Sequence, residues 1–253
     1  MPALLVMPGL AFVASVVATM AAGSSMAAHA QPMPGGWMSS FASMAAACGR
    51  RDAAAAGTFA GMWGAMTVAM MLPSFVPALW RHRLRLARTD ASRLARAAAI
   101  AAAGYGAAWM VLGFVVLALA ALAGEALLQR PAWSRAVPLL AGAVVIAAGV
   151  LQWTGWKWRH LARCRAMLAH VGVPHSGSAW GRGWRLGLHC TGACANWVVA
   201  LLAIGVMDRG AMAFMTLAVV AERGARRAGL VVQVAGILLV GTGAFMVGQA
   251  WSR

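Results

Sequence analysis

Acidic side chains are almost missing from this sequence. Asp and Glu together account for 5 of its 253 residues, and charged residues of both signs make up 10% of the chain. A soluble domain carries about 25% charged residues, so an ordinary water-covered surface is excluded. Hydrophobic residues make up 62% of the chain instead, and the mean hydropathy is +0.75. The composition therefore predicts an integral membrane protein.

The sequence also lacks the signatures of common enzyme sites. It contains no HExxH zinc motif, no phosphate-binding loop and no nucleophile elbow. Its few carboxylates lie at the ends of apolar segments or between them, and none pairs with another as an acid–base couple does. The sequence offers no positive case for an enzyme, and we identify no catalytic residue.

Seven apolar segments run along the chain. A transmembrane helix needs about 20 apolar residues, and no segment shows the alternation of a barrel strand, so helices must satisfy the backbone. We expect an all-α, polytopic transmembrane bundle of about seven spans, forming one domain over residues 1–253. A long outer loop covers 24–57, and a basic inner loop covers 155–185. The seven segments are 3–23, 58–80, 97–124, 136–156, 186–207, the short 210–221, and 229–250.

The first segment has a second interpretation. Ala28-His29-Ala30 resembles the cleavage site of a signal peptide, but no Lys or Arg precedes the apolar run. The stretch between the apolar run and that site is also unusually long. An uncleaved helix is favoured.

Basic residues set the expected orientation. The net charge is +16, from 21 Lys and Arg, and these residues fall between apolar runs rather than in one nucleic-acid-binding patch. We therefore expect lipid head groups, and no nucleic acid, as partners of the charge. Most Lys and Arg lie in alternate loops, which the positive-inside rule places in the cytoplasm together with the N-terminus. The other loops and the C-terminal end hold Arg50, Arg51, Arg130, Arg135, Arg209 and Arg253.

Soft side chains gather at the inner membrane boundary. Cys190 and Cys194 are four residues apart on one predicted helix, and His160 and Cys164 repeat that spacing on the preceding one. Residues four apart share a helix face, so two neighbouring helices can offer one imidazole and three thiols. That set fits tetrahedral zinc, or copper(I) at a lower coordination number. His189 points about 100° away from Cys190 and is assigned to the second shell or to packing.

Each of these residues also has a simpler explanation. Cysteine is a common small apolar residue in buried helices, and a histidine in a basic loop is often solvated. Glu222, at the inner end of the sixth segment, either gates a cation or pairs with a nearby arginine at the interface. A thiol relay in a membrane redox enzyme is a third possibility.

Methionine is the second unusual feature, with 17 residues. Met62, Met66 and Met70 recur every four residues and form one stripe, and Met207 and Met215 lie near the outer turn of the bundle. A thioether suits copper(I) because it is soft, and its uncharged state does not depend on pH. We expect these residues to form a path toward the inner thiols; alternatively, they only fill gaps between helices.

A set of motif residues runs from 59 to 223: Gly61, Met62, Trp63, Met66, Met70, Met71, Pro73, Gln152, Lys157, Leu161, Cys164, Arg165, Gly187, His189, Cys190, Gly192, Cys194, Met207, Met215 and, more loosely, Glu222 and Arg223. This set resembles the pattern of a bacterial family of predicted metal-binding integral membrane proteins, domain of unknown function 2182. The resemblance implies a helical bundle in the bacterial inner membrane and a metal site. Position 160 is His where the family usually has Cys, Ala193 stands where a paired Cys is common, and Val198 replaces a Met.

Taken together, the sequence predicts a multi-pass inner-membrane protein that binds or transports a soft transition metal. Copper(I) is the first candidate and zinc the second, with a membrane or periplasmic protein as a possible partner. The rival is a structural or assembly subunit of a membrane metalloenzyme complex that has no metal site of its own.

Overall fold

The computed structural model describes most of the chain. The backbone is described over residues 10–21, 31–33, 37–39, 53–85, 91–129, 131–169, 178–205 and 208–252. Within these ranges, the side chains are described for residues 10–21, 57–75, 95–120, 122, 136–169, 178–205 and 208–252.

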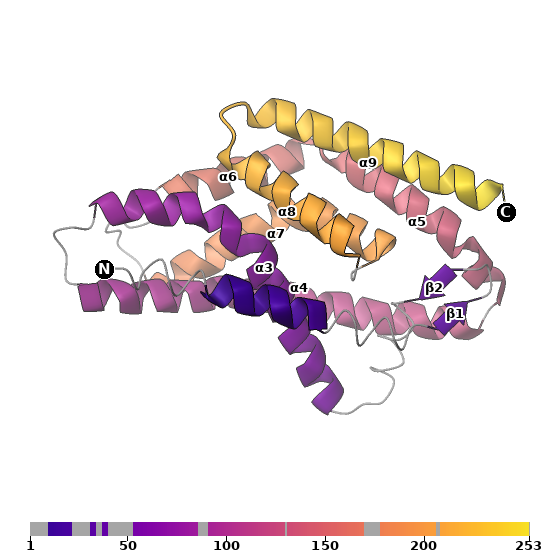
Figure 1. Cartoon of the computed structure of the whole chain (residues 1–253), viewed down its shortest axis with the longest axis horizontal. Helices are drawn as coiled ribbons and strands as arrows, with labels where there is room; N and C mark the ends of the chain where they lie inside the picture. Colours follow the sequence, from indigo (N-terminus) through magenta and orange to yellow (C-terminus); the bar gives the residue numbers. More distant parts are fainter. Residues whose placement is uncertain are drawn as a thin grey trace.

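Long helices make up nearly all of the described structure (Figure 1). This confirms the all-α class, apart from a small antiparallel hairpin of β1 (Gln31–Met33) and β2 (Trp37–Ser39). A first, unlabelled helix covers Leu10–Ala21. The labelled helices are α3 (Ala53–Arg85), α4 (Ala91–Gln129), α5 (Pro131–Leu151), α6 (Gly155–Ala169), α7 (Ala179–Ile204), α8 (Arg209–Gly224) and α9 (Ala228–Trp251).

The number of membrane-crossing helices is smaller than the seven expected. Among the described residues, three helices are long and apolar enough to cross a membrane, namely Ala95–Ala120, Ala179–Ile204 and Ala228–Trp251. A fourth span is possible if α5 and α6 act as one bent pair. In its described part, Leu10–Ala21, the first segment is a helix shorter than a span, and α8 has 16 residues, below the roughly 20 that a span needs.

The beginning of the inner loop expected over 155–185 is a separate helix, α6, and it does not continue α5 in a straight line. The two helices meet at 63°, after a break at residues 152–154. Lys157, Leu161 and Cys164 of α6 are buried, and the helix packs against α7. The predicted inner loop therefore begins with a packed helix, whereas His170 and His175 lie outside the described residues.

Glycines let two pairs of helices pack closely. Helix α4 lies along α7, where a side chain at Gly183 would collide with the backbone carbonyl of Ala101. Helices α5 and α9 run side by side (Figure 1), and at Gly142 and Gly243 each backbone nearly touches the other. Small residues allow this approach between helices in apolar surroundings. The two pairs form the frame on which the shorter helices α6 and α8 rest.

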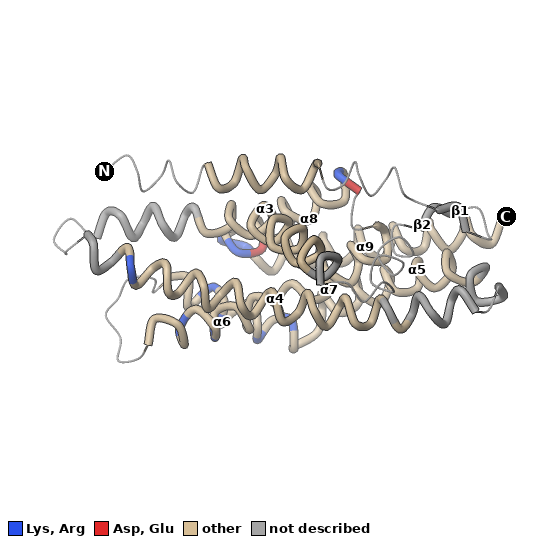
Figure 2. Tube along the Cα trace, turned by 90° about the horizontal axis from the view of Figure 1, so that it is seen from below, with Lys and Arg blue, Asp and Glu red and all other residues tan. Residues whose placement is uncertain are grey.

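Charge is unevenly distributed over this frame. Figure 2 shows that most of the described chain carries neither sign, and that Lys and Arg concentrate along α6 and the adjoining ends of its neighbours. Helix α9 has no charged residue. Two of the basic residues, Lys157 and Arg223, are nevertheless buried in the bundle, and both contribute to the site described below.

The contact between α4 and α7 gives a stability test. We expect Gly183→Ala to lower the free energy of unfolding by about 1–3 kcal/mol, because the new methyl group meets backbone that cannot move aside as a side chain would. Thermal unfolding of the purified protein in detergent measures the change.

Gly241→Ala is the matched control, because a methyl group at Gly241 of α9 meets no atom within 4 Å. Alanine also favours the helix there, so this variant should be at least as stable as the parent. Equal midpoints for the two variants would refute the close approach of α4 and α7.

Candidate metal centre

Three of the four cysteines meet in the interior, where α6 packs against α7. Cys164 of α6 and Cys190 of α7 are fully buried, and Cys194 of α7 is 2% exposed. The side chain of Cys190 interacts with those of both Cys164 and Cys194. All three remain free thiols. As the i,i+4 spacing predicts, the sulfurs of Cys190 and Cys194 lie on one buried face of α7.

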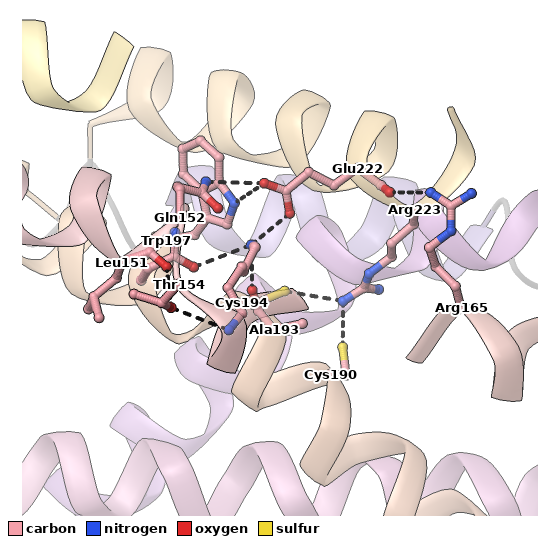
Figure 3. A network of polar contacts seen from close by, with 12 residues as sticks. Leu151, Gln152, Thr154, Arg165, Cys190, Ala193, Cys194, Trp197, Glu222 and Arg223 are labelled. Atoms are coloured by element: carbon pink, nitrogen blue, oxygen red, sulfur yellow. Dashed lines mark hydrogen bonds and ion pairs between the residues drawn. The ribbon is translucent and has the colours of Figure 1, made fainter. Parts of the chain in front are cut away.

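An arginine side chain lies among these sulfurs. Arg223, near the end of α8, donates from Nη2 to the Sγ of Cys190 at 2.5 Å and to the Sγ of Cys194 at 3.2 Å (Figure 3). The same nitrogen lies 3.5 Å from the Sδ of Met71 on α3, and Nη1 donates to the Ser74 hydroxyl at 2.6 Å. Two sequence segments about 150 residues apart thus meet α7 at one guanidinium. We call Met71, Cys164, Cys190, Cys194 and Arg223 the sulfur cluster.

A phenol adds a further polar group to the sulfur cluster. The hydroxyl oxygen of Tyr105 on α4 lies 2.9 Å from the Sγ of Cys190. Its ring also packs edge-on against Phe75 of α3, with ring centroids 5.0 Å apart. Tyr105 is the one tyrosine in the chain, and it connects α4 to both the sulfur cluster and α3.

Beside the sulfur cluster lies a buried ion pair. The Nζ of Lys157 on α6 is 2.7 Å from the Oε2 of Glu222, and both side chains are at most 2% exposed. Gln152 and Trp197 each donate to the Oε1 of Glu222 at 3.1 Å. Lys157 also donates to the carbonyl oxygen of Ala193 at 2.6 Å (Figure 3). Glu222 thus pairs with a lysine in the interior and not with an arginine at the membrane interface.

Arg165 fastens the end of α8 from outside. Its Nη1 donates to the carbonyl oxygen of Glu222 at 2.8 Å, and its Nη2 to that of Ala225 at 3.0 Å. Carbonyl groups at a helix C-terminus lack partners within the helix, so an arginine there both satisfies them and fixes the position of the helix. Glu222 and Arg223 are held in place as a result.

His160 has a different neighbour from the one expected. Its ring centroid lies 5.5 Å from that of His189 on α7 and 4.8 Å from that of Trp156. Gly192 makes room for the imidazole, because a Cβ at that position would overlap the ring. The Nδ1 atoms of both histidines are buried and have no hydrogen-bond partner among the described residues. The structure thus pairs His160 with His189, while its role as a metal ligand remains a prediction.

The methionine stripe is buried as a unit. Met62, Met66 and Met70 of α3 are each less than 10% exposed, and Met215 of α8 is 1% exposed. All four belong to the same apolar core as the cysteines. Met207 lies outside the described residues. The burial agrees equally with a soft path and with packing, so the path stays a prediction.

The donor set can be compared with the needs of a metal. Among the described residues, no group of three or more His, Cys, Asp or Glu side chains is arranged to hold a metal ion as it stands. The sulfur cluster differs from such a group in containing a thioether and an arginine. Thiolate and thioether ligands select copper(I) among biological metals. The chemistry of the residues therefore fits copper(I), provided that the guanidinium nitrogen moves.

The sequence alone did not identify the part played by Arg223 and Met71. Lys157 was attributed to the basic inner loop, and Arg223 was noted only for a loose motif match. A usable signal was present, because an ionisable residue within or next to an apolar segment is costly and tends to be functional. Met71 adjoins the predicted stripe but faces the guanidinium.

Comparison with known protein families gives one match. A family model described as PpoB2, copper chaperone, matches residues 60–246. The matched region includes α4 to α8 in full and α3 from residue 60 onward, and therefore the whole sulfur cluster. This supports a copper-related family, under a different name from the one that the motifs suggested. Curated proteins and solved structures give no match.

The buried ion pair predicts a large stability effect. We expect Glu222→Gln to destabilise the fold by about 3–5 kcal/mol, because it leaves the ammonium group of Lys157 buried without a counter-charge. Adding Lys157→Met should restore part of the loss. Unfolding midpoints in detergent measure both changes.

Arg159→Met serves as the control, since this residue of α6 is exposed and bonds only locally, to the carbonyl oxygen of Gly155. Its effect should stay within about 0.5 kcal/mol. Strictly additive losses in the double variant would contradict the pairing of Lys157 with Glu222.

Proposed function

Because the chain belongs to the copper chaperone family PpoB2, we propose that it binds copper(I) at the thiols of Cys164, Cys190 and Cys194 and hands the ion to a partner protein. The observation that carries this proposal is the meeting of three buried free thiols between α6 and α7. Copper is the cargo in this proposal and not a resident cofactor.

Copper(I) suits the site better than zinc. Zinc in structural sites takes four ligands, usually from Cys and His, in a tetrahedron. The sulfur cluster offers thiols and a thioether, and His160 lies against His189 instead. Copper(I) accepts soft sulfur donors at a lower coordination number. Zinc would need His160 to turn away from its present neighbours.

Burial of the thiols suits a carrier of copper. The three sulfurs lie in the main apolar core, where water and competing ligands are excluded. Release then requires a neighbouring helix to shift. Helix α8 is the candidate, since it is short and holds the sulfur cluster through Arg223 and the ion pair through Glu222.

The setting of this chemistry is a membrane in our proposal. Three helices, or four with the bent pair, are long and apolar enough to cross a bilayer, and the excess of Lys and Arg suits the cytoplasmic face. We place the protein in a bacterial inner membrane as a multi-pass protein, with lipid and a membrane or periplasmic copper acceptor as partners. In this proposal the buried stripe of Met62, Met66 and Met70 forms the path for copper. These residues lie on α3, the helix that also carries Met71 of the sulfur cluster.

One rival deserves a test, because the thiols do belong to the apolar core. In that case the cysteines only pack, and the chain is a structural or assembly subunit of a membrane complex. Metal content separates the two. A packing role predicts that the folded protein binds no copper under reducing conditions, whatever the copper(I) concentration.

The proposal predicts a loss of copper on removing the thiols of α7. The double substitution Cys190→Ser and Cys194→Ser should abolish bound copper(I), since a hydroxyl is a poor ligand for a soft ion. Copper per chain is measured by elemental analysis after loading and desalting under reducing conditions. Cys48→Ser, which removes the thiol that is not part of the proposed site, should leave the copper content unchanged. Equal copper in the double variant and the parent would disprove this site.

A further inference from the structure

The position of one nitrogen atom suggests where copper binds. The Nη2 atom of Arg223 lies 2.5 Å from Cys190 Sγ, 3.2 Å from Cys194 Sγ and 3.5 Å from Met71 Sδ (Figure 3 shows the two cysteines). A positively charged group therefore already lies close to all three sulfur atoms. Arg223 is buried, so its charge must be met by whatever surrounds it.

The groups that accept hydrogen bonds from this guanidinium are unusually weak acceptors. A buried arginine normally meets a carboxylate, but in the described part of the chain Arg223 donates to sulfur atoms and to the hydroxyl of Ser74. The carboxylate of Glu222 next to it is engaged by Lys157. Sulfur is a poor hydrogen-bond acceptor but a strong ligand for a soft cation. The surroundings of Nη2 thus suit copper(I) better than they suit the guanidinium.

We infer that copper(I) binds at the place of the Arg223 Nη2 atom, with the Met71 thioether as a ligand beside the thiolates of Cys190 and Cys194. This inference rests on the proposed function and narrows its ligand set: Met71 of α3 is a ligand, and Cys164 stays a protonated thiol next to Cys190. Copper and Nη2 cannot occupy the same point, so binding moves the guanidinium aside. Its Nη1 contact with Ser74 provides an anchor about which the group can turn.

The distances are compatible with this exchange. A metal–thiolate bond is about 2.3 Å long in zinc sites, so Cys194 and Met71 need to close in by about 1 Å while Cys190 hardly moves. Met71 and Ser74 are three residues apart on α3 and share a helix face. The Ser74 hydroxyl also donates to the carbonyl oxygen of Met71 at 2.7 Å. This turn of α3 is therefore already aligned with the site.

Charge and protons balance in this step. Copper(I) with two thiolates carries a net charge of −1, and the thioether adds none. The displaced guanidinium, still buried nearby, carries +1 and neutralises the complex. The two protons that the thiols lose pass to water outside the bundle. No electron is transferred, since copper enters and stays as copper(I).

Exchange of Met71 tests the inference. Met71→Leu should weaken copper(I) binding by about tenfold or more, because a ligand is lost while side-chain volume is kept. Met110→Leu is the matched control, since Met110 of α4 packs against the same core and belongs neither to the sulfur cluster nor to the methionine stripe, and it should change the affinity by less than about twofold. Affinity is measured on the full chain in detergent, by competition with a chromogenic copper(I) chelator, and unfolding midpoints verify that both variants are folded.

A second measurement reports the bond itself. In selenomethionine-labelled protein, X-ray absorption at the selenium edge should show a copper neighbour in the parent and in Met110→Leu, and none in Met71→Leu. If Met71→Leu binds copper as well as Met110→Leu does, or if the selenium–copper signal survives in it, the inference is wrong while the cysteine site stands. If the parent binds no copper(I) at all, the proposed function falls as well.

Discussion

In the part of the chain that the structure describes, two cationic side chains are buried but only one carboxylate is buried with them, and that imbalance organises the site. Lys157 and Arg223 both lie in an apolar interior, where an unpaired charge is very costly. Among the side chains that the structure describes, Glu222 is the buried carboxylate, and it pairs with Lys157. Arg223 is left with thiols, a thioether and a hydroxyl. The site therefore holds a cation, the guanidinium of Arg223, next to sulfur atoms.

Helix α8 connects this charge arrangement to the fold. Glu222 and Arg223 are consecutive. Glu222 faces polar groups of α6, α7 and the break after α5, while Arg223 faces the sulfurs of α3 and α7. Arg165 holds the end of the same helix. The close-packed pairs α4–α7 and α5–α9 provide the rigid support, since glycine contacts leave their backbones little freedom to separate. A change at the sulfur cluster is thereby coupled to a short helix that has few other polar anchors.

Local patterns in the sequence predict part of this arrangement well. The apolar runs account for the helices, and the four-residue spacing of Cys190 and Cys194 correctly places both thiols on one buried face. The neighbouring position of Cys164 also follows, because α6 and α7 are consecutive antiparallel helices. These features depend on helix periodicity and chain order, which a sequence displays directly.

The remaining features depend on how helices rotate and cross, which periodicity does not determine. The bend of 63° between α5 and α6 turns His160 toward His189. The contact of Met71 with Arg223 joins positions 152 residues apart. Among the described residues, fewer helices qualify as spans than the seven apolar segments predict, because apolar composition alone does not distinguish a spanning helix from a short buried one, as α8 illustrates. Pairing of Lys157 with Glu222 likewise required the tertiary packing of α6 on α7 and α8.

The central claim is that sulfur atoms, and not imidazoles, hold copper(I) in this protein. X-ray absorption at the copper edge of the purified, copper(I)-loaded chain tests it most directly, because sulfur and nitrogen neighbours scatter differently and lie at different distances. The account predicts a first shell made up of sulfur alone. A first shell dominated by nitrogen would place copper on the His160–His189 pair and contradict the account.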